Sequence, residues 1–250
     1  MDETIDWLGH ATVRIELDGI RILTDPTIRD RIGPLNRKVA PIPHRELEAI
    51  DIVLISHLHQ DHLDLASLRR LGDARLIVPA GSGSIFRAAG HRDVDELAPG
   101  EETSHGSLTI EVLPAEHSGF RPPFGPTAPA LGFVVSNRRR RIYFAGDTAI
   151  FPGMSDIADL DVALVPVWGW GPYLRGGHMD PRMAADALTL LRPRVAVPIH
   201  WGTFWPKALG LVRPDRLQLP GSEFRAAAAE IAPRVRTEVL SPGERLSSLG

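Results

Sequence analysis

The alternation of apolar and polar positions predicts a chain that begins with strands and continues with alternating strands and helices. Residues 4–24 fit a meander, with strands at 5–8, 11–17 and 20–23 and a hairpin turn at Asp18-Gly19. Apolar runs predict further strands at 52–56, 75–78, 107–114, 131–136, 141–145, 162–167, 194–199 and 234–240. Helices are expected over 63–71, 153–159, 181–191 and 222–231, with a short one ending near residue 89.

Two long connections are expected to be surface loops, one over 26–44 and a Pro/Gly-rich one over 119–129. Neither has the composition of a linker that would divide the chain. The element order therefore predicts an α+β protein with a single domain over 1–250. Its two mixed β-sheets would pack together with helices on the outer faces.

One stretch carries most of the candidate chemistry. Residues 56–64 place three histidines and two aspartates directly after a short apolar strand. His57 and His59 are two positions apart, so on extended chain they project to the same side. Asp61 and His62 follow where the chain begins to turn, and they can point at a second centre. Imidazole and carboxylate ligands without a thiolate suit zinc or a similar divalent ion.

Three more polar residues follow predicted strands at the point where the apolar run stops. They are His117, Asp147 and His200. We expect the strands to deliver these side chains to the same rim as the 57–62 stretch. A metal site built in this way would rest on rigid supports.

Composition narrows the function classes. The 250 residues are 43% hydrophobic, enough for a sizeable core, and a net charge of -3 gives no reason to expect bulk nucleic-acid binding. There is no cysteine, so disulfides and thiolate metal sites are excluded. The N-terminus lacks the features of a signal peptide, and no apolar run is long enough to span a bilayer. We expect a cytoplasmic protein with a small-molecule substrate, and a homo-oligomer remains open.

The order His57-x-His59-x-Asp61-His62, His117, Asp147 in a Gly-Asp-Thr turn, and His200 resembles the metallo-β-lactamase superfamily. Further motifs are similar to one branch of it, which includes N-acylphosphatidylethanolamine-hydrolysing phospholipase D and L-ascorbate-6-phosphate lactonase-like proteins. These motifs are the segments 7–13, 23–26, 143–148, 178–181 and 200–204.

The resemblance implies an αβ/βα sandwich with a two-metal site at one edge. His57, His59 and His117 would hold one ion, and Asp61, His62 and His200 the other. Asp147 would bridge them. Zinc is the first choice for both ions, with Mn, Fe or Ni as alternatives.

The implied activity is a metal-dependent hydrolase that uses a hydroxide bridging the two ions, acting on a phosphodiester or a lactone-type ester. Asp61 is a further catalytic candidate, because it could take up the proton. His178 could donate a proton to the leaving group or bind substrate, or it could serve only in capping or packing. Trp168 and Tyr173 are candidate substrate contacts, although aromatic residues in a loop can equally be packing.

Other interpretations stay open. One is a metallo-nuclease of the same superfamily, against which stand the acidic pI of about 6.4 and the lack of an inserted clamp domain. Another is a non-catalytic metal-binding protein, which is weakened because every ligand position is filled. His10 is expected to make a buried structural hydrogen bond or to support a ligand, and Asp25 to hydrogen-bond a ligating histidine. The arginines 138–141 favour a solvated edge over a nucleic-acid patch.

Overall fold

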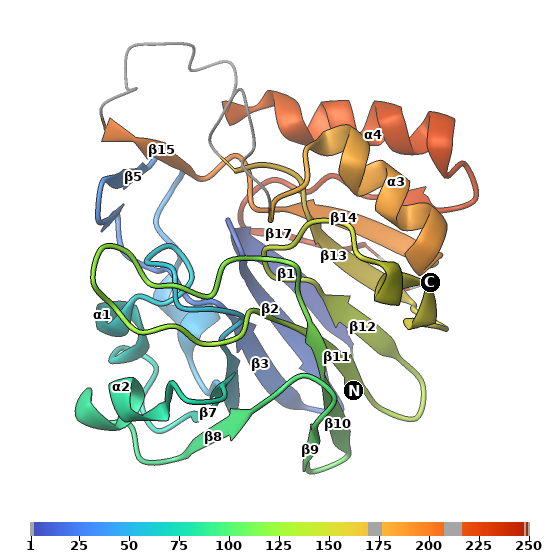
Figure 1. Cartoon of the computed structure of the whole chain (residues 1–250). Coiled ribbons are helices and arrows are strands. Elements are labelled where there is room, and N and C mark those ends of the chain that lie inside the picture. Colours follow the sequence, from blue (N-terminus) through green and yellow to red (C-terminus); the bar gives the residue numbers. More distant parts are fainter. Residues whose placement is uncertain (1–2, 170–176, 208–216, 248, 250) are drawn as a thin grey trace.

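The computed structural model describes residues 3–169, 177–207, 217–247 and 249. Two seven-stranded sheets lie face to face and share one large hydrophobic core (Figure 1). The N-terminal sheet has the strand order β17-β1-β2-β3-β6-β7-β8. These strands span Glu244–Arg245, Thr4–Gly9, Thr12–Leu17, Ile20–Thr24, Ile52–Leu54, Arg75–Pro79 and Val94–Leu97.

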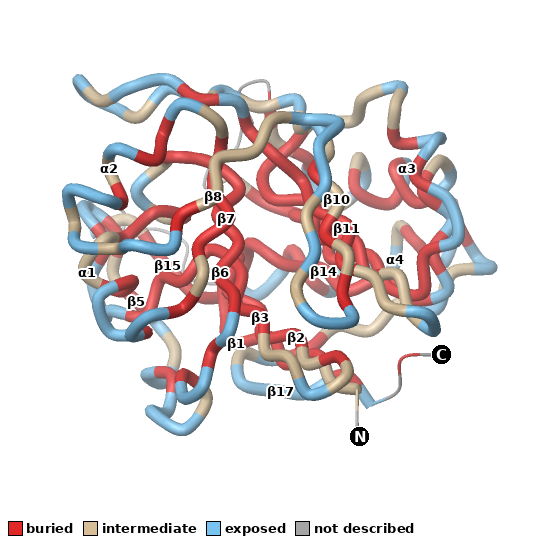
Figure 2. Tube along the Cα trace, turned by 90° about the horizontal axis from the view of Figure 1, so that it is seen from below, coloured by how far each residue is buried: buried red, intermediate tan, exposed pale blue. Residues whose placement is uncertain are grey.

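The second sheet has the order β16-β14-β13-β12-β11-β10-β9. These strands span Arg236–Thr237, Val195–Ile199, Val162–Pro166, Arg141–Phe144, Leu131–Ser136, Leu108–Pro114 and Glu102–His105. A small third sheet joins β15 (Phe204–Pro206), β5 (Leu35–Arg37) and β4 (Arg31–Ile32). The core between the two large sheets consists of aliphatic and aromatic side chains, and the tube in Figure 2 is buried through its centre.

Helices cover the outer faces of the sandwich. Helices α1 (Leu65–Leu68) and α2 (Gly83–Ala88) lie outside the N-terminal sheet, whereas α3 (Pro181–Leu191) and α4 (Leu219–Ile231) cover β13 and β14 (Figure 1). Asp180 caps α3 through Met183 N, as the Asp-Pro start predicts. The predicted α+β sandwich of two mixed sheets with outer helices is confirmed, and a single domain over 1–250 stays a prediction.

Strand direction brings the polar residues together. β3 and β6 are parallel, and so are β12, β13 and β14. The carboxyl ends of these strands therefore meet at one rim, where backbone bonds join the two sheets. Leu131 N donates to Ser56 O (2.8 Å) and His200 N donates to His10 O (2.9 Å). The ligand-bearing stretches of both sheets are thus fixed relative to each other.

Several predicted boundaries were wrong. The helix expected over 63–71 is only α1, because Leu63 N already bonds His59 O in a turn and Asp64 caps the helix behind it. The helix expected over 153–159 is a 3₁₀ turn, Pro152–Asp156, and the strand expected over 234–240 is reduced to β16. The 26–44 loop contains β4 and β5, and a second 3₁₀ turn, His44–Leu47, begins at its end; short polar sequences do not signal these elements.

The arginine-rich turn joins β11 and β12, which are interior strands of the second sheet. Arg139 and Arg140 form ion pairs with Glu3, and Arg141 pairs with Glu111. Neighbouring carboxylates therefore partly neutralise these charges, whereas the sequence favoured a solvated edge. None of the described helices has the length and apolar character needed to cross a membrane.

Candidate metal centre

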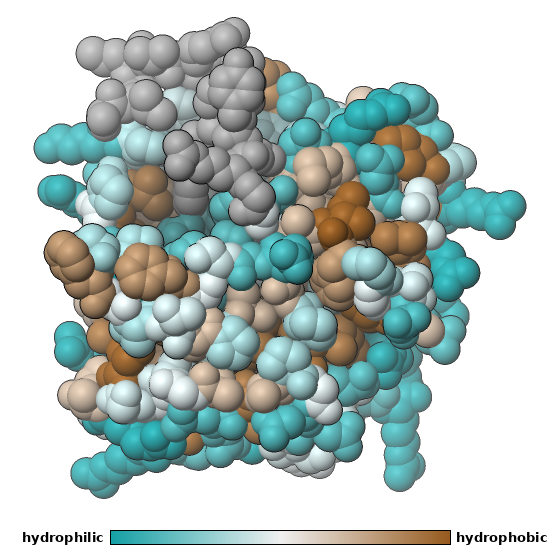
Figure 3. Space-filling view, viewed as in Figure 1, coloured by the Kyte–Doolittle hydropathy of each residue, from teal (hydrophilic) through white to brown (hydrophobic). Residues whose placement is uncertain are grey.

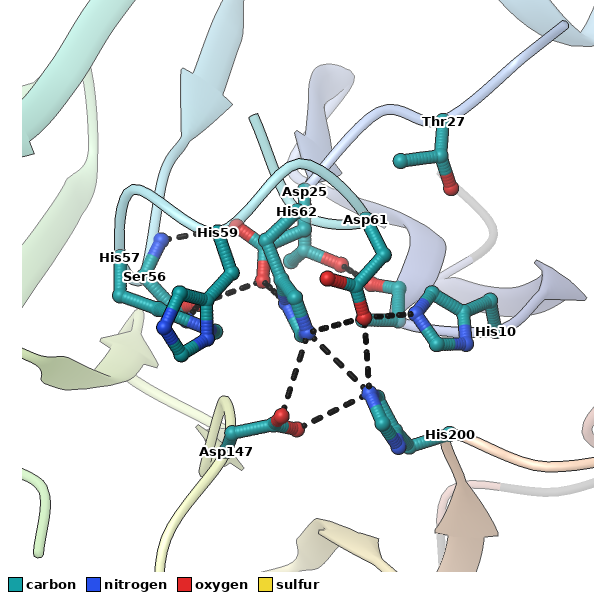
Figure 4. A network of polar contacts seen from close by, with 12 residues as sticks. His10, Asp25, Thr27, Ser56, His57, His59, Asp61, His62, Asp147 and His200 are labelled. Carbon is teal, nitrogen blue, oxygen red and sulfur yellow. Dashed lines mark hydrogen bonds and ion pairs between the residues drawn. The ribbon is translucent and has the colours of Figure 1, made fainter. Parts of the chain in front are cut away.

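Two groups of side chains converge at the rim. The first triad consists of His57, His59 and His117, whose facing nitrogens are 3.0 Å apart for both the His57–His59 and the His59–His117 pair. The second triad consists of Asp61, His62 and His200. His62 Nε2 and His200 Nε2 are 3.1 Å apart, and each lies 3.5 Å from Asp61 Oδ2 (Figure 4).

Asp147 lies between the triads. Its Oδ2 is 3.4 Å from His62 Nε2, and its Oδ1 is 3.2 Å from His200 Nε2. It also groups with His117 and His178 within 4.8 Å. The backbone that presents Asp147 depends on Gly146, which has a φ of +61° and packs where a Cβ would meet Ser56 Cβ and Leu131 O. Glycine is needed there, because any side chain would displace the turn.

The other nitrogen of each ring is held by an acceptor. His62 Nδ1 donates to Asp25 Oδ2 (2.7 Å), and His200 Nδ1 donates to Trp168 O (2.6 Å). His117 Nδ1 donates to Gly177 O (2.6 Å), and His57 Nδ1 donates to Ser56 Oγ (3.0 Å). With these protons held on Nδ1, the Nε2 lone pairs of the four rings face inward. This is the arrangement by which proteins orient histidines toward a metal.

Convergent lone pairs repel one another unless a cation lies between them. Ligand nitrogens around a zinc ion at 2.0–2.1 Å are separated by roughly 3.0–3.4 Å, which the spacing in both triads matches. In addition, Asp147 Oδ1 is buried and makes no hydrogen bond among the described residues. The donor set therefore fits divalent ions, with nitrogen and carboxylate ligands suited to zinc.

The charges at the site favour a cation. Burial opposes ionisation of Asp147, but His200 and His62 outweigh it and hold its pKa well below the usual value. Burial also opposes charging of His62, yet the carboxylates of Asp147, Asp61 and Asp25 hold its pKa well above the usual value, so that a proton occupies this ring where no ion is bound and an ion would displace it. A buried cluster with this concentration of carboxylate charge is stabilised by positive charge at its centre.

His178 lies against the centre. Its Nδ1 is 3.3 Å from Asp147 Oδ2, and its ring centroid is 4.7 Å from that of His117. Burial lowers the pKa of His178, against the attraction of Asp147, and a lowered pKa makes the protonated ring a stronger acid. Its Nδ1 makes no hydrogen bond within the described part of the chain. The structure thus brings His178 to the site, in contact with Asp147.

The aromatic substrate contacts stay predictions. The Trp168 indole is buried and stacks on Trp205, with ring centroids 5.7 Å apart. The backbone carbonyl of Trp168 accepts from His200 Nδ1. Tyr173 falls outside the described residues.

Supporting residues complete the site. The predicted hydrogen bond between Asp25 and a histidine is confirmed, and Ser56 Oγ extends it by donating to Asp25 Oδ2 (2.5 Å). His10 Nε2 lies 3.1 Å from Asp61 Oδ2, so His10 supports a candidate ligand. Burial and the nearby His200 lower the pKa of His10 to about 3, which keeps this ring neutral.

Sequence reasoning missed Arg121. Its guanidinium donates to the carbonyls of Leu58 and Leu63, which ties the 119–129 loop to the histidine stretch. No sequence signal marks this contact, because an arginine in a Pro/Gly-rich loop has the pattern of an ordinary solvated residue. Ser56 was missed for a similar reason, since a serine beside the histidines has many possible roles.

Known proteins share these features. The family model for the β-lactamase superfamily domain matches residues 20–201. N-acyl-phosphatidylethanolamine-hydrolyzing phospholipase D 1 of Caenorhabditis elegans is 32% identical over 79% of this chain and 63% of its own length. This chain therefore spans less than two thirds of that relative. A UPF0173 metal-dependent hydrolase of Caldivirga maquilingensis is 32% identical over 97% of both chains.

A solved structure agrees with these relatives. Igni18, a metallo hydrolase of Ignicoccus hospitalis, aligns with 98% of this chain and 97% of its own at 25% identity, with a TM-score of 0.72. The predicted metallo-β-lactamase fold and the prediction of a metal-dependent hydrolase are confirmed at the level of the family. The match over residues 20–201 and the full-length relatives together show that the chain belongs to the β-lactamase superfamily.

Proposed function

We propose that this protein is a two-metal hydrolase that activates water for attack on a phosphodiester or a lactone-type ester. One observation carries the proposal: the imidazole lone pairs of two triads converge, while acceptors elsewhere hold the opposite ring protons. A single ion would leave the repulsion between the converging lone pairs of one triad without a cation to offset it. Two ions would offset this repulsion in both triads.

The proposed ligand sets follow the triads. His57, His59 and His117 would hold the first ion, and Asp61, His62 and His200 would hold the second. Asp147 would lie between them, because its oxygens are 3.2 and 3.4 Å from nitrogens of the second triad and it also groups with His117 of the first triad within 4.8 Å. Divalent ions held there, such as zinc, would supply a water of lowered pKa and would neutralise charge on the substrate oxygens.

The protein residues supply orientation and proton transfer. Asp25 and His10 fix His62 and Asp61, so little reorganisation is needed during reaction. Asp61 takes up the proton released from water. His178, whose side chain is 20% exposed, holds the proton for the leaving group on the open side of Asp147.

The relatives favour ester chemistry without naming the substrate of this chain. The relative from Caenorhabditis elegans is named for hydrolysing a phospholipid phosphodiester, which supports the phosphodiester as the first class to test. The substrate is proposed to be a small molecule. No observation on the described residues favours a nuclease over this assignment.

The test has two stages. Elemental analysis of the purified protein should find about two divalent ions per chain. A screen should then compare bis(p-nitrophenyl) phosphate with simple lactones, using His59→Ala and Asp61→Ala as inactive controls. Metal-dependent turnover of one class and not the other assigns the reaction. Full activity in metal-free protein would refute the proposal.

A further inference from the structure

A groove opens directly beside the metal centre. It has a volume of about 380 Å³, and two of the proposed ligands, His59 and Asp61, form part of its wall. The rest of the wall is Gln60 and five apolar residues: Ile32, Pro34, Leu35, Pro122 and Pro123. A molecule reacting at the ions would therefore extend into this groove.

The chemistry of the wall selects what can occupy it. Among the described residues that line the groove, Asp61 is the only charged one, and its carboxylate faces the centre. Opposite it stand the aliphatic and proline side chains, which offer no ionic partner to a substrate. Binding of an apolar group in such a groove is favourable, because its surface is removed from water. A charged group there would lose its hydration without compensation.

One side of the groove is braced by the small sheet. Ile32 and Leu35 are 2% and 8% exposed, and both pack against Phe204 of β15. Lys207 N also donates to Pro34 O (2.9 Å). The apolar wall formed by the β4–β5 hairpin is thus already in place before a ligand arrives.

The other side is braced by Arg121. Its contacts with Leu58 O and Leu63 O hold the adjoining Pro122 and Pro123 beside the histidine stretch. The same loop carries Phe124, which is 96% exposed and does not line the groove. Figure 3 shows apolar side chains on the surface over this loop. Phe124 therefore offers a matched control for apolar surface outside the groove.

From this geometry we infer that the groove binds an uncharged alkyl or acyl group attached to the scissile centre of the substrate, and that Leu35 is a specificity-determining residue. The inference rests on the proposed two-metal function, because His59 and Asp61 place the scissile centre. The occupant is one part of a single substrate molecule. A lipid surface that engages Phe124 is the competing outcome.

A series of n-alkylphosphonates tests this without knowledge of the substrate. The phosphonate head probes the ions and the tail probes the groove. Binding of the methyl to octyl compounds to zinc-loaded protein should be measured by calorimetry below their micelle-forming concentrations. We expect Kd to fall by about three- to fourfold for each added methylene, until the groove is filled. A flat series, with the methyl compound bound, would overturn the inference.

Two variants locate the tail. Leu35→Asn keeps the branching of the side chain but replaces its two methyl groups with an amide, and should flatten the series while leaving Kd for methylphosphonate unchanged. Phe124→Asn should leave the whole series unchanged. If instead Phe124→Asn flattens it, the tail binds the exposed loop and the groove assignment is wrong. Thermal melts check that Leu35→Asn folds, and the wild-type series stands without it.

Failure of the underlying function has a different signature. If the zinc-loaded protein binds no phosphonate head and turns over no ester, the two-metal proposal fails, and this inference fails with it. If the head binds but the tail adds nothing, only the groove assignment fails.

Discussion

The two triads of the centre differ in what holds them. The second triad is supported from the core: His62 by Asp25, Asp61 by His10 and His200 by the carbonyl of Trp168. The first triad depends more on loops, since His117 is held by Gly177 O and His59 hydrogen-bonds the backbone of Phe120. His62 and His200 are buried, whereas His59 and His117 are half-buried.

This difference assigns separate tasks to the two sides of one centre. The second triad, which is supported from the core, should keep its geometry when the surface loops move. A loop-supported triad lies where solvent and substrate reach the centre, beside the apolar groove. We therefore expect the second ion to be the tightly held one and the first to exchange more readily.

The largest expected effect comes from removing one triad at a time. His117→Ala and His200→Ala should each lower kcat/KM by about a thousandfold or more, because a two-ion centre loses its water activation with either ion. Elemental analysis should show that each variant keeps about one ion. In the wild type, zinc transfer to a chromogenic chelator should be biphasic, with the fast phase absent from His117→Ala. A single phase would contradict the expectation that the first ion exchanges more readily than the second.

Removing His178 should cost less. We expect His178→Ala to lower kcat by roughly 10²- to 10⁴-fold, the usual contribution of a general acid, with zinc content unchanged. The loss should shrink for substrates whose leaving group needs no proton, such as p-nitrophenyl esters compared with alkyl esters. Equal losses for both would show that His178 only orients the site.

Removing the core support should have a smaller effect again. Asp25→Asn keeps the shape of the side chain but weakens its hold on His62 Nδ1, so zinc affinity should fall about 10- to 100-fold at the second triad. Competition with a calibrated chelator measures this change. Asp30→Asn, an exposed change in the same segment, is the control. Loss from the first triad instead would contradict the assignment of Asp25.

The smallest expected effect lies just beyond the histidine stretch. Asp64 caps α1 through Ser67 N and pairs with Arg29. Burial opposes its charge, but Arg29 and Ser67 lower its pKa below the usual value. A lowered folded-state pKa stabilises the protein above the unfolded pKa, and this is lost as pH falls through the folded value. Asparagine can still cap the helix, so Asp64→Asn should cost about 1 kcal/mol at pH 7 through the weakened bonds to Arg29 and Ser67, and less at pH 2, as measured by urea unfolding.

Much of this centre could be predicted from local sequence. The 57–62 stretch, His117, Asp147 and His200 each follow an apolar run, and parallel strands that end at one edge bring such residues together. Asp25 was also foreseeable, because it ends a strand ahead of a proline.

The remainder depends on contacts between distant segments. Arg121 bonds carbonyls 58 to 63 positions away, and no local pattern reports a partner at that distance. The β4–β5 hairpin and β15 are short strands that pair mainly with each other, so tertiary pairing and not apolar periodicity creates them. The sequence predicted a loop over 26–44, where β4 and β5 form. Strands this short therefore have too little apolar periodicity to be recognised from sequence.

The backbone bonds that join the two sheets at the rim have a thermodynamic consequence. Leu131 N–Ser56 O and His200 N–His10 O hold the ligand-bearing segments of the two sheets in register. Ions bound across that seam would bind the native chain and not the unfolded one. The free energy of unfolding should then rise by about 1.4 kcal/mol for each tenfold increase of free zinc above Kd. The melting temperature should rise with it. Metal binding at this centre would thus be coupled to the folding of the protein.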